Sequence, residues 1–334
     1  MTAPTVQHHC PARAAIAGNP SDGYGGAVVA VPVDACRATV RVDAHARFEI
    51  DPAPTDDDTF TTWADLAEHV DRFGYRGSRP LLLATLRRFA AHTSHQPRPV
   101  AIRLSTSIPR SVGLGGSSAI VIAALRCLYD INELAPPSND ELASLALSVE
   151  TDELDIGAGL QDRVVQAYAG PVLMEFGADD QRVVGGLTAG SYRPVRWDHL
   201  ASLVVATRPH EAEPSHLLHN DLRSRFRSGD ERVLAAMVTL ADCARRAAAA
   251  IEHGDHSALA GAIDDTFDTR LSITTATTGQ RRSVEIVRAS GGAANSTGSG
   301  GSIVALARDD QHRAALADQL SADGCVVLPV GRTA

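Results

Sequence analysis

Hydrophobic residues along this chain fall into short β-branched runs and longer stretches with helical spacing. Residues 14–17, 27–33 and 38–42 are short runs bounded by Gly, Pro and Asp, which predicts strands joined by turns. Four later runs also predict strands: residues 100–104, 172–176, 203–206 and 303–306. The N-terminal part of the chain is therefore expected to be rich in β-structure.

Other stretches have the periodicity of helices. Apolar residues recur at helical spacing over residues 80–92 and 120–128. Ser138 and Glu141 form a capping-box pattern ahead of Leu142 and Leu145, so a helix is expected to begin there and run toward Glu150. The other predicted helices are residues 215–226, 230–251 and 309–320.

Residues 177–196 interrupt this pattern with four glycines, Pro194 and little periodicity. Such a stretch is typical of a boundary between two lobes. We therefore expect an N-terminal domain of residues 1–190 and a C-terminal domain of residues 191–334.

Charge limits the classes of partner. The chain has 334 residues and a formal charge of −9 at pH 7. An acidic protein is a poor partner for nucleic acid, whose phosphate backbone binds basic surfaces, whereas a small phosphorylated ligand is compatible with it. All 31 basic residues are Arg, so the sequence excludes any mechanism that needs a lysine ammonium.

The five cysteines are far apart and form no C-x-x-C pair, which predicts buried, reduced thiols. The first twenty residues lack the apolar core of a signal peptide, and no later run is long enough to span a bilayer. We therefore expect a cytoplasmic protein with no membrane partner. His8, His9 and Cys10 are expected to lie in a flexible tail rather than a metal site.

A glycine-rich segment before a predicted helix carries the strongest chemical signal. Residues 108–119, I-P-R-S-V-G-L-G-G-S-S-A, directly precede an apolar helical run. Glycines let the backbone approach a polyphosphate, and the amides of a helix N-terminus point toward it. The segment matches neither the P-loop nor the dinucleotide pattern, and a simple turn with an N-cap is the alternative. The candidate phosphate-binding residues are Gly113, Leu114, Gly115, Gly116, Ser117 and Ser118.

Two further glycine-rich segments lie near the ends of the chain. Residues 18–26, G-N-P-S-D-G-Y-G-G, by themselves predict only a hairpin turn. Residues 291–302, G-G-A-A-N-S-T-G-S-G-G-S, lead directly into a predicted strand, so a flexible linker fits them poorly. Such a loop can lie across phosphates and donate backbone amides. Its candidate residues are Thr297, Gly298, Ser299 and Gly300.

In chain order, residues 18–26, 108–119 and 291–302 are the first, second and third glycine-rich segments. Two acidic residues, Glu150 and Asp162, lie between the second and the third. Mg²⁺ prefers carboxylate, hydroxyl and phosphate oxygens, and a carboxylate close to an attacking hydroxyl accepts its proton. For either residue alone, a place on an exposed helix face is the more common explanation.

Taken together and in this order, the segments resemble those of the GHMP kinases, the family of galactokinase, homoserine kinase, mevalonate kinase and phosphomevalonate kinase. Residues 108–119 resemble the family motif P-x-x-x-G-L-G-S-S-A with one extra small residue. G-N-P-S-D-G-Y-G-G, G-G-S-S-A-I-V and G-L-Q-D-R-V-V-Q-A-Y are similar to segments of glucuronokinases. The resemblance covers nearly the whole chain and implies an α+β fold in two lobes, with ATP in the cleft between them.

The resemblance also implies roles for single residues. Arg13 would lie near the transferring phosphoryl group, and Asp162 would be the catalytic base or would orient the hydroxyl. Mg²⁺ would be held by Glu150 together with either Ser117 or Ser118. The residues implied to contact the sugar are Asn19, Ser21, Asp22, Tyr24 and Gly25.

The implied reaction is transfer of the γ-phosphoryl group of MgATP to a sugar hydroxyl, with the anomeric hydroxyl favoured. The alternatives are a heptose, a modified sugar of secondary metabolism or a mevalonate-like alcohol as acceptor, and a non-catalytic nucleotide or sugar sensor on the same scaffold. Glucuronokinases often carry Lys where this chain has Ala27, so binding of a uronic carboxylate requires an arginine such as Arg163, Arg223 or Arg270. A monomer or homodimer is expected.

Overall fold

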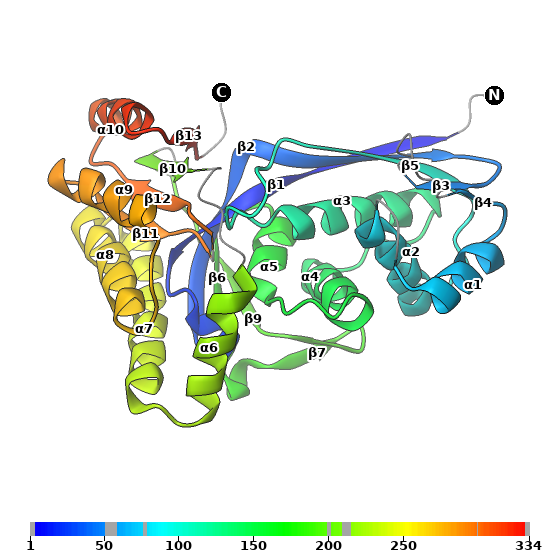
Figure 1. Ribbon diagram of the computed structural model, residues 1–334, viewed down its shortest axis with the longest axis horizontal. Helices are drawn as coiled ribbons and strands as arrows, with labels where there is room; N and C mark the ends of the chain where they lie inside the picture. The colour runs from blue at the N-terminus through cyan, green and yellow to red at the C-terminus, as the bar shows by residue number, and fades with distance from the viewer. Residues whose placement is uncertain are drawn as a thin grey trace.

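The computed structural model describes residues 4–50, 59–75, 79–198, 202–208, 215–298 and 300–330, with side chains for all of these except 215–220. These residues form two lobes (Figure 1). One lobe is a long mixed sheet with helices on one face. The other lobe contains a smaller antiparallel sheet and a group of long helices.

The large sheet has the strand order β4-β3-β5-β2-β6-β9, and β1 pairs with β2 outside this path. β1 and β2 are antiparallel from Thr5 opposite Asp43 to Ala17 opposite Val29. The only parallel pair among the described strands is β3 with β5. The bounds are β1 (Thr5–Ala17), β2 (Ala27–Ala44), β3 (Phe48–Ile50), β4 (Thr59–Phe60), β5 (Val100–Thr106), β6 (Val172–Glu175) and β9 (Ser191–Pro194).

Residues 27–33 and 38–42, which the sequence predicts as separate strands, belong to the single strand β2. The register between β1 and β2 shifts between Ala15 and Ala17 and, by more residues, where Pro11 lies opposite Arg37 and Ala12 opposite Val33. Residues 34–36 therefore bulge out of the ladder. The break in the hydrophobic pattern marks a bulge rather than a turn.

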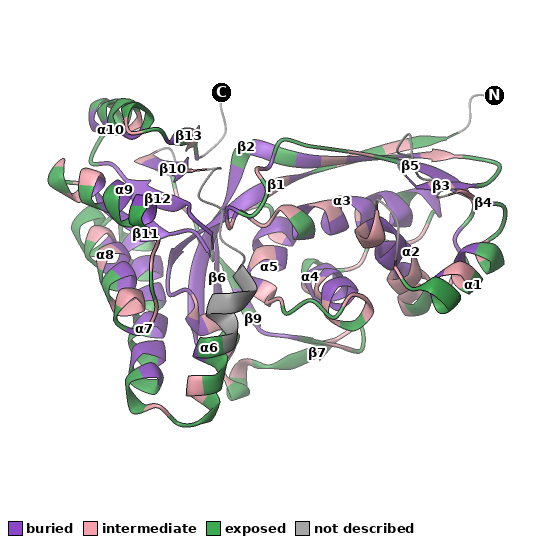
Figure 2. Ribbon diagram, in the orientation of Figure 1, coloured by how far each residue is buried: buried purple, intermediate pink, exposed green. Residues whose placement is uncertain are grey.

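The helices of the large lobe lie along one face of the sheet, below it in Figure 1. α3 packs on β1 and β2 and is itself covered by α2, α4 and α5. This position explains why α3 is rich in apolar residues, most of which are buried; Figure 2 shows the burial of each residue along the helix. The bounds are α1 (Trp63–Phe73), α2 (Pro80–Thr93), α3 (Gly116–Ile131), α4 (Asn139–Ser148) and α5 (Leu160–Tyr168), with the hairpin β7 (Arg182–Val184) and β8 (Leu187–Ala189) beside α4.

The second lobe is built on the sheet β11-β12-β10-β13. A hydrophobic cluster that includes β1 and β2 continues into its helices α7 and α8, so one core joins the two lobes. The bounds are β10 (Leu203–Thr207), α6 (Ser215–Arg227), α7 (Glu231–His253), α8 (His256–Ile273), α9 (Thr278–Ala289), β11 (Ala293–Ser296), β12 (Ile303–Leu306), α10 (Asp310–Ala322) and β13 (Val326–Pro329).

Several expectations from the sequence can now be compared with the fold. The mixed α+β architecture and the helices predicted at residues 80–92, 120–128 and 230–251 are confirmed. All five cysteines are free and buried, as expected. Among the described residues, no helix has the length and apolar character needed to cross a bilayer.

Two other expectations have different outcomes. The flexible N-terminal tail is wrong, because residues 5–17 form β1, where Cys10 is fully buried and the His8 ring lies 2.7 Å from Asp130 Oδ2. The predicted boundary after residue 190 falls just before β9, which pairs with β6 in the large sheet. As a division into two domains, 1–190 and 191–334, it stays a prediction.

Gly18, where β1 ends against the second lobe, provides a test of this packing. Its φ is +99°, and an added Cβ would lie 2.4 Å from the Ala27 carbonyl oxygen and 2.7 Å from Ala244 Cβ. Gly254 also has a positive φ, +67°, but nothing lies within 4 Å of a Cβ there. We expect Gly254→Ala to lose about 1 kcal/mol of unfolding free energy, and Gly18→Ala to lose about 3 kcal/mol because overpacking adds to the backbone cost. Equal losses in urea unfolding of the two variants would contradict the close contact between the lobes.

Candidate active site

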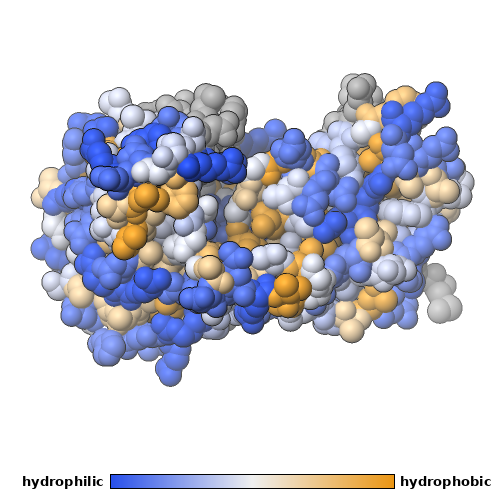
Figure 3. All heavy atoms as spheres, turned by 90° about the horizontal axis from the view of Figure 1, so that it is seen from below, coloured by the Kyte–Doolittle hydropathy of each residue, from blue (hydrophilic) through white to orange (hydrophobic). Residues whose placement is uncertain are grey.

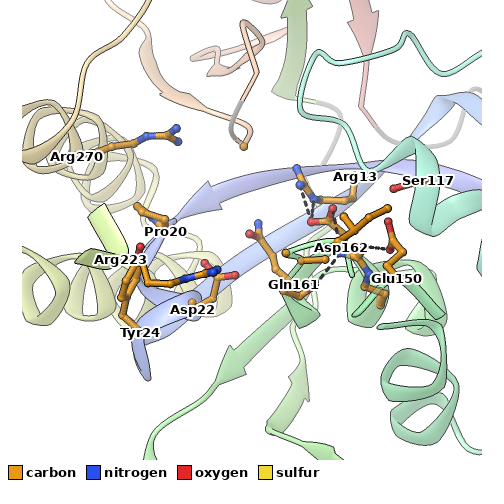
Figure 4. Close-up of a pocket in the computed structure, with 17 residues that line it drawn as sticks. Arg13, Pro20, Asp22, Tyr24, Ser117, Glu150, Gln161, Asp162, Arg223 and Arg270 are labelled. Carbon is orange, nitrogen blue, oxygen red and sulfur yellow. Dashed lines mark hydrogen bonds and ion pairs between the residues drawn. The ribbon is translucent and has the colours of Figure 1, made fainter. Parts of the chain in front are cut away.

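A cavity of about 240 Å³ lies where the two lobes meet. Its walls come from β1, the start of α3, the loop before α5, and the helices α6 and α8. Hydrophobic residues gather in the middle of the face shown in Figure 3, between the two lobes, whereas hydrophilic residues cover most of both lobes. Figure 4 shows that the charged side chains of the cavity form two groups, one around Arg13 and Asp162 and one around Asp22.

Arg13 of β1 connects several walls of the cavity and is almost fully buried. Its Nε donates to Asp162 Oδ1 at 2.5 Å. Its Nη1 donates to the carbonyl oxygen of Gly113 at 2.8 Å and to that of Thr297 at 2.6 Å. A single guanidinium therefore binds the start of α5 and two of the glycine-rich segments, which are far apart in the sequence.

The second glycine-rich segment, residues 108–119, leads into α3 at the edge of the cavity. Gly113 and Gly115 have positive φ values of +77° and +68°, which glycine adopts without strain. The first backbone bond of the helix runs from the Ala119 amide to the Gly115 carbonyl, so the amides of residues 116–118 lie ahead of it at the helix end. These amides and the helix dipole favour an anion at this position.

The two serines of this segment point in different directions. Ser117 lines the cavity. Ser118 is fully buried, and its hydroxyl donates to the Gly115 carbonyl oxygen at 3.0 Å. The choice between these serines, which the sequence leaves open, therefore favours Ser117 as the one that faces a ligand.

The third glycine-rich segment, residues 291–302, packs directly on the second, residues 108–119. A Cβ on Gly298 would lie 2.8 Å from the Gly113 carbonyl oxygen, and a Cβ on Gly300 would lie 2.1 Å from the Val112 carbonyl carbon. Only glycine permits so close an approach of two backbones. Gly298 lines the cavity, the Thr297 hydroxyl donates to the Gly113 carbonyl oxygen at 3.2 Å, and Ser299 lies outside the described residues.

The first glycine-rich segment, residues 18–26, contributes only some of its predicted residues to the cavity. Asp22 and Tyr24, in the short 3-10 helix η1 (Ser21–Tyr24), line it. Asn19 Nδ2 instead donates to the Ser296 carbonyl oxygen at 3.0 Å, and the Ser21 hydroxyl donates to the Ala27 carbonyl oxygen at 2.7 Å. Gly25 ends η1 with a φ of +78°. These three residues are therefore placed to support the segment, and only Asp22 and Tyr24 reach the cavity.

Asp22 has an unusual electrostatic position. Burial raises its pKa to about 6, the neighbouring Asp162 carboxylate adds to the rise, and Arg13 opposes it. A Cβ on Gly159 would lie 3.5 Å from Asp22 Oδ2, so the loop before α5 passes directly beside this carboxylate. Asp22 thus titrates close to neutral pH inside the cavity.

Glu150 and Arg163 form a buried ion pair beside Asp162. Glu150 lies in the π-helical turn η2 (Val149–Glu153), which continues from α4, and its Oε2 accepts from Arg163 Nη2. Arg163 Nη1 also bonds the Gly159 carbonyl oxygen at 2.8 Å and lies 3.5 Å from Asp162 Oδ2. Arg163 therefore orients both acids with its two terminal nitrogens, and its buried Nε has no hydrogen-bond partner in the described structure.

The residues present fit a magnesium ion that arrives with a nucleotide. Ser117 and Glu150 both line the cavity, and no described residue bonds the second carboxylate oxygen of Glu150. Mg²⁺ is commonly held by one or two carboxylates together with phosphate oxygens. The described residues contain no cluster of three or more His, Cys, Asp or Glu side chains for a metal, and such a nucleotide-borne ion needs none.

Several lining residues were not predicted, and Gln161 has the clearest chemical role among them. The Gln161 side chain is buried, and its amide nitrogen has no hydrogen-bond partner in the described structure. It lies between Asp162 and Asp22 in Figure 4. A buried donor without a partner is rare and points to a ligand acceptor. The available signal was its place in G-L-Q-D-R, directly before the predicted catalytic acid.

The chain has relatives among known proteins, and they decide its family. Residues 80–170 match the GHMP kinases N terminal domain, and residues 247–324 match the GHMP kinases C terminal domain. Glucuronokinase 1 of Arabidopsis thaliana is 32% identical over 316 residues, which is 90% of this chain and 84% of that protein. Probable glucuronokinase 2 of the same plant is 31% identical over 342 residues, which is 97% of this chain and 90% of that protein. The chain belongs to the GHMP kinases.

The fold agrees with this family. The phosphomevalonate kinase of Streptococcus pneumoniae, in complex with phosphomevalonate and AMPPNP, has a TM-score of 0.77 at 16% identity, over 98% of this chain and 100% of that chain. That likeness concerns the fold, and it confirms the predicted two-lobed GHMP kinase architecture. GHMP kinases take their phosphoryl group from ATP, so this chain is an ATP-dependent phosphotransferase with an alcohol acceptor.

Arg13→Lys tests the network around the guanidinium. Lysine keeps the charge but lacks the planar fork that bonds Asp162 and two carbonyl oxygens together. We expect kcat to fall about 10²- to 10³-fold, the cost of removing one donor that stabilises developing charge. The matched control is Arg208→Lys, which changes an arginine paired with Asp323 in the second lobe and should keep its activity. An Arg13→Lys enzyme within threefold of the wild-type kcat would contradict the assignment.

Proposed function

We propose that this GHMP kinase transfers the γ-phosphoryl group of MgATP to the anomeric hydroxyl of a sugar, and that the sugar is a hexuronic acid such as glucuronic acid. The glucuronokinase relatives support the sugar and the hydroxyl. One observation in the structure supports the chemistry most strongly. Asp162 faces the cavity beside Arg13, Ser117 and the N-terminal end of α3, so an acceptor hydroxyl and a triphosphate can meet there.

The residues divide the work of phosphoryl transfer. The amides of residues 113–118 would hold the β- and γ-phosphates, with Gly298 on the opposite side. Mg²⁺, held by Ser117 and Glu150, would neutralise phosphate charge when bound. Arg13 would stabilise the charge on the transferring group. Phosphoryl transfer depends mainly on positioning and charge stabilisation, and this set of residues supplies both.

The bonds change in a balanced way. The oxygen of the anomeric hydroxyl forms a bond to the γ-phosphorus as the bond from that phosphorus to the bridging oxygen of ADP breaks. The proton of the hydroxyl passes to Asp162, whose second oxygen is not taken by Arg13. The products are ADP and a sugar 1-phosphate, and the proton then leaves Asp162 for solvent.

The other acceptors considered from the sequence are less well supported. A mevalonate-like alcohol does not need the polar group formed by Asp22, Tyr24 and the Gln161 amide, which suits several sugar hydroxyls. A heptose would use these contacts but would leave the arginines near Asp22 without an anion. A non-catalytic sensor does not need Asp162 held between two arginines at the phosphate end of the cavity.

The proposed function is tested by ADP release from MgATP over free sugars, uronic acids and heptoses, and by Asp162→Asn with the best acceptor. General-base assistance contributes about 10²- to 10⁴-fold in rate, so kcat should fall by that factor while MgATP affinity stays nearly constant. Asp155→Asn, just outside the cavity, is the control and should keep wild-type turnover. If Asp162→Asn turns over as fast as wild type, Asp162 is not the base.

The pH dependence of sugar binding follows from Asp22. Above pH 6 its carboxylate is ionised and accepts hydrogen bonds from sugar hydroxyls, and below pH 6 it is protonated. The KM for sugar should therefore rise as the pH falls through about 6. Asp22→Asn should have a higher KM at neutral pH but lack this step. Identical pH profiles for wild type and Asp22→Asn, measured by steady-state kinetics at saturating MgATP, would show that Asp22 does not contact the sugar.

A further inference from the structure

Four arginines line the cavity, and they differ in whether the protein already uses them. Arg13 and Arg163 are bonded to Asp162, Glu150 and backbone carbonyl oxygens. The guanidinium groups of Arg223 in α6 and Arg270 in α8 make no hydrogen bond or ion pair with any described residue, although both residues line the cavity. We call Arg223 and Arg270 the free arginine pair.

The free arginine pair lies at the end of the cavity away from the phosphate-binding residues. In Figure 4, Arg223 reaches toward Asp22 and Tyr24, and Arg270 lies beyond Pro20, whereas Ser117 and Glu150 lie on the far side of Arg13. A Cβ on Gly157 would lie 3.8 Å from one terminal nitrogen of Arg223 and 3.9 Å from the other, so this guanidinium extends over the loop before α5. The pair therefore surrounds the sugar end rather than the nucleotide end.

Arg270 is partly buried without a partner, which favours an anion beside it, whereas Arg223 is exposed to solvent. Burial lowers the pKa of Arg270 to about 10, which Asp22 opposes and Arg13 reinforces, so the side chain is still charged at neutral pH. A desolvated charge is unfavourable unless it is paired. The planar guanidinium matches the two oxygens of a carboxylate, and such charge-assisted bonds are about twice as strong as neutral ones.

The local charge distinguishes a carboxylate from a phosphate ester. Two arginines and the Asp22 carboxylate give this end of the cavity a net charge of about one positive unit at neutral pH. A monoanionic carboxylate neutralises that charge, whereas a dianionic phosphate would leave an excess of negative charge beside Asp22. In a hexuronic acid the ring carbons that carry the carboxylate and the anomeric hydroxyl flank the ring oxygen. The carboxylate can therefore face the free arginine pair while the anomeric hydroxyl faces Asp162.

Resting on the function proposed above, we infer that Arg223 and Arg270 bind the carboxylate of the hexuronic acid and set the preference for an acidic over a neutral sugar. The lobe that carries α6 and α8 then recognises the anionic substituent, while β1, α3 and α5 carry out the transfer. This assignment also supplies the cation that the chain lacks at Ala27.

The test uses the full chain with MgADP bound and measures sugar binding by calorimetry, in parallel with steady-state kinetics with MgATP. The probes are D-glucuronate, D-glucose as its neutral counterpart and D-glucose 6-phosphate as its dianionic counterpart. Wild type should bind glucuronate at least about 100-fold more tightly than glucose. Arg223→Met and Arg270→Met should each reduce the ratio of glucuronate to glucose affinity about 10- to 100-fold, and the double variant should show almost no preference.

The matched control is Arg227→Met, which removes an exposed arginine one turn along α6 that does not line the cavity. It should keep the wild-type preference. Arg270→Lys provides a second variant at a position where truncation could disturb packing, and it should retain part of the preference because the charge remains. Thermal unfolding of each variant separates lost recognition from lost folding.

The outcomes separate this inference from the proposed function. Equal affinity of wild type for glucuronate and glucose, tighter binding of glucose 6-phosphate, or variants that weaken MgATP binding instead of glucuronate binding would each overturn the role of the free arginine pair. Preferential binding of glucuronate without phosphoryl transfer to it would support the arginine pair but contradict the proposed reaction.

Discussion

The contact between Arg13 and Asp162 is the interaction on which the rest of the site depends. The Arg13 guanidinium also bonds the carbonyl oxygens of Gly113 and Thr297, so the same group positions Asp162, the proposed base, and joins two glycine-rich segments. The bond to Thr297 is buried and the other two are partly buried, and electrostatic interactions are stronger there than in water. The site therefore depends on β1 holding its position between the two lobes.

Because the chain contains no lysine, arginine is the cation at every positively charged position of the cavity. Every cation in the cavity is an arginine, and each is used according to the acceptors that surround it. Arg13 and Arg163 make several bonds to protein oxygens and so fix the positions of Asp162 and Glu150. The side chains of Arg223 and Arg270 have no such acceptors among the described residues, and we propose that they bind the substrate. The end of the cavity around Arg13 and Arg163 is therefore preorganised, whereas the side chains of Arg223 and Arg270 at the other end can adapt to a ligand.

The sequence predicts much of the fold and only part of the site, for identifiable reasons. Long apolar helices such as α3 and α7 have a strong period, whereas α9 is largely polar and was missed. The glycine-rich motifs locate the phosphate-binding residues because glycine geometry is local. The direction of a side chain is not local: Asn19 and Ser21 have the composition of sugar ligands, but they bond the backbone. Likewise, nothing in the sequence shows that Arg163 is paired with Glu150 while Arg270 is free.

The central claim is that the anomeric hydroxyl of a hexuronic acid meets the γ-phosphate of ATP between Asp162 and Arg13. A crystal structure with an unreactive ATP analogue, Mg²⁺ and D-glucuronate tests it most directly. We predict the γ-phosphate at the start of α3 beside Arg13, with the anomeric oxygen within hydrogen-bond distance of Asp162. A nucleotide bound away from residues 113–118, or a sugar that presents a different hydroxyl to Asp162, would contradict the account.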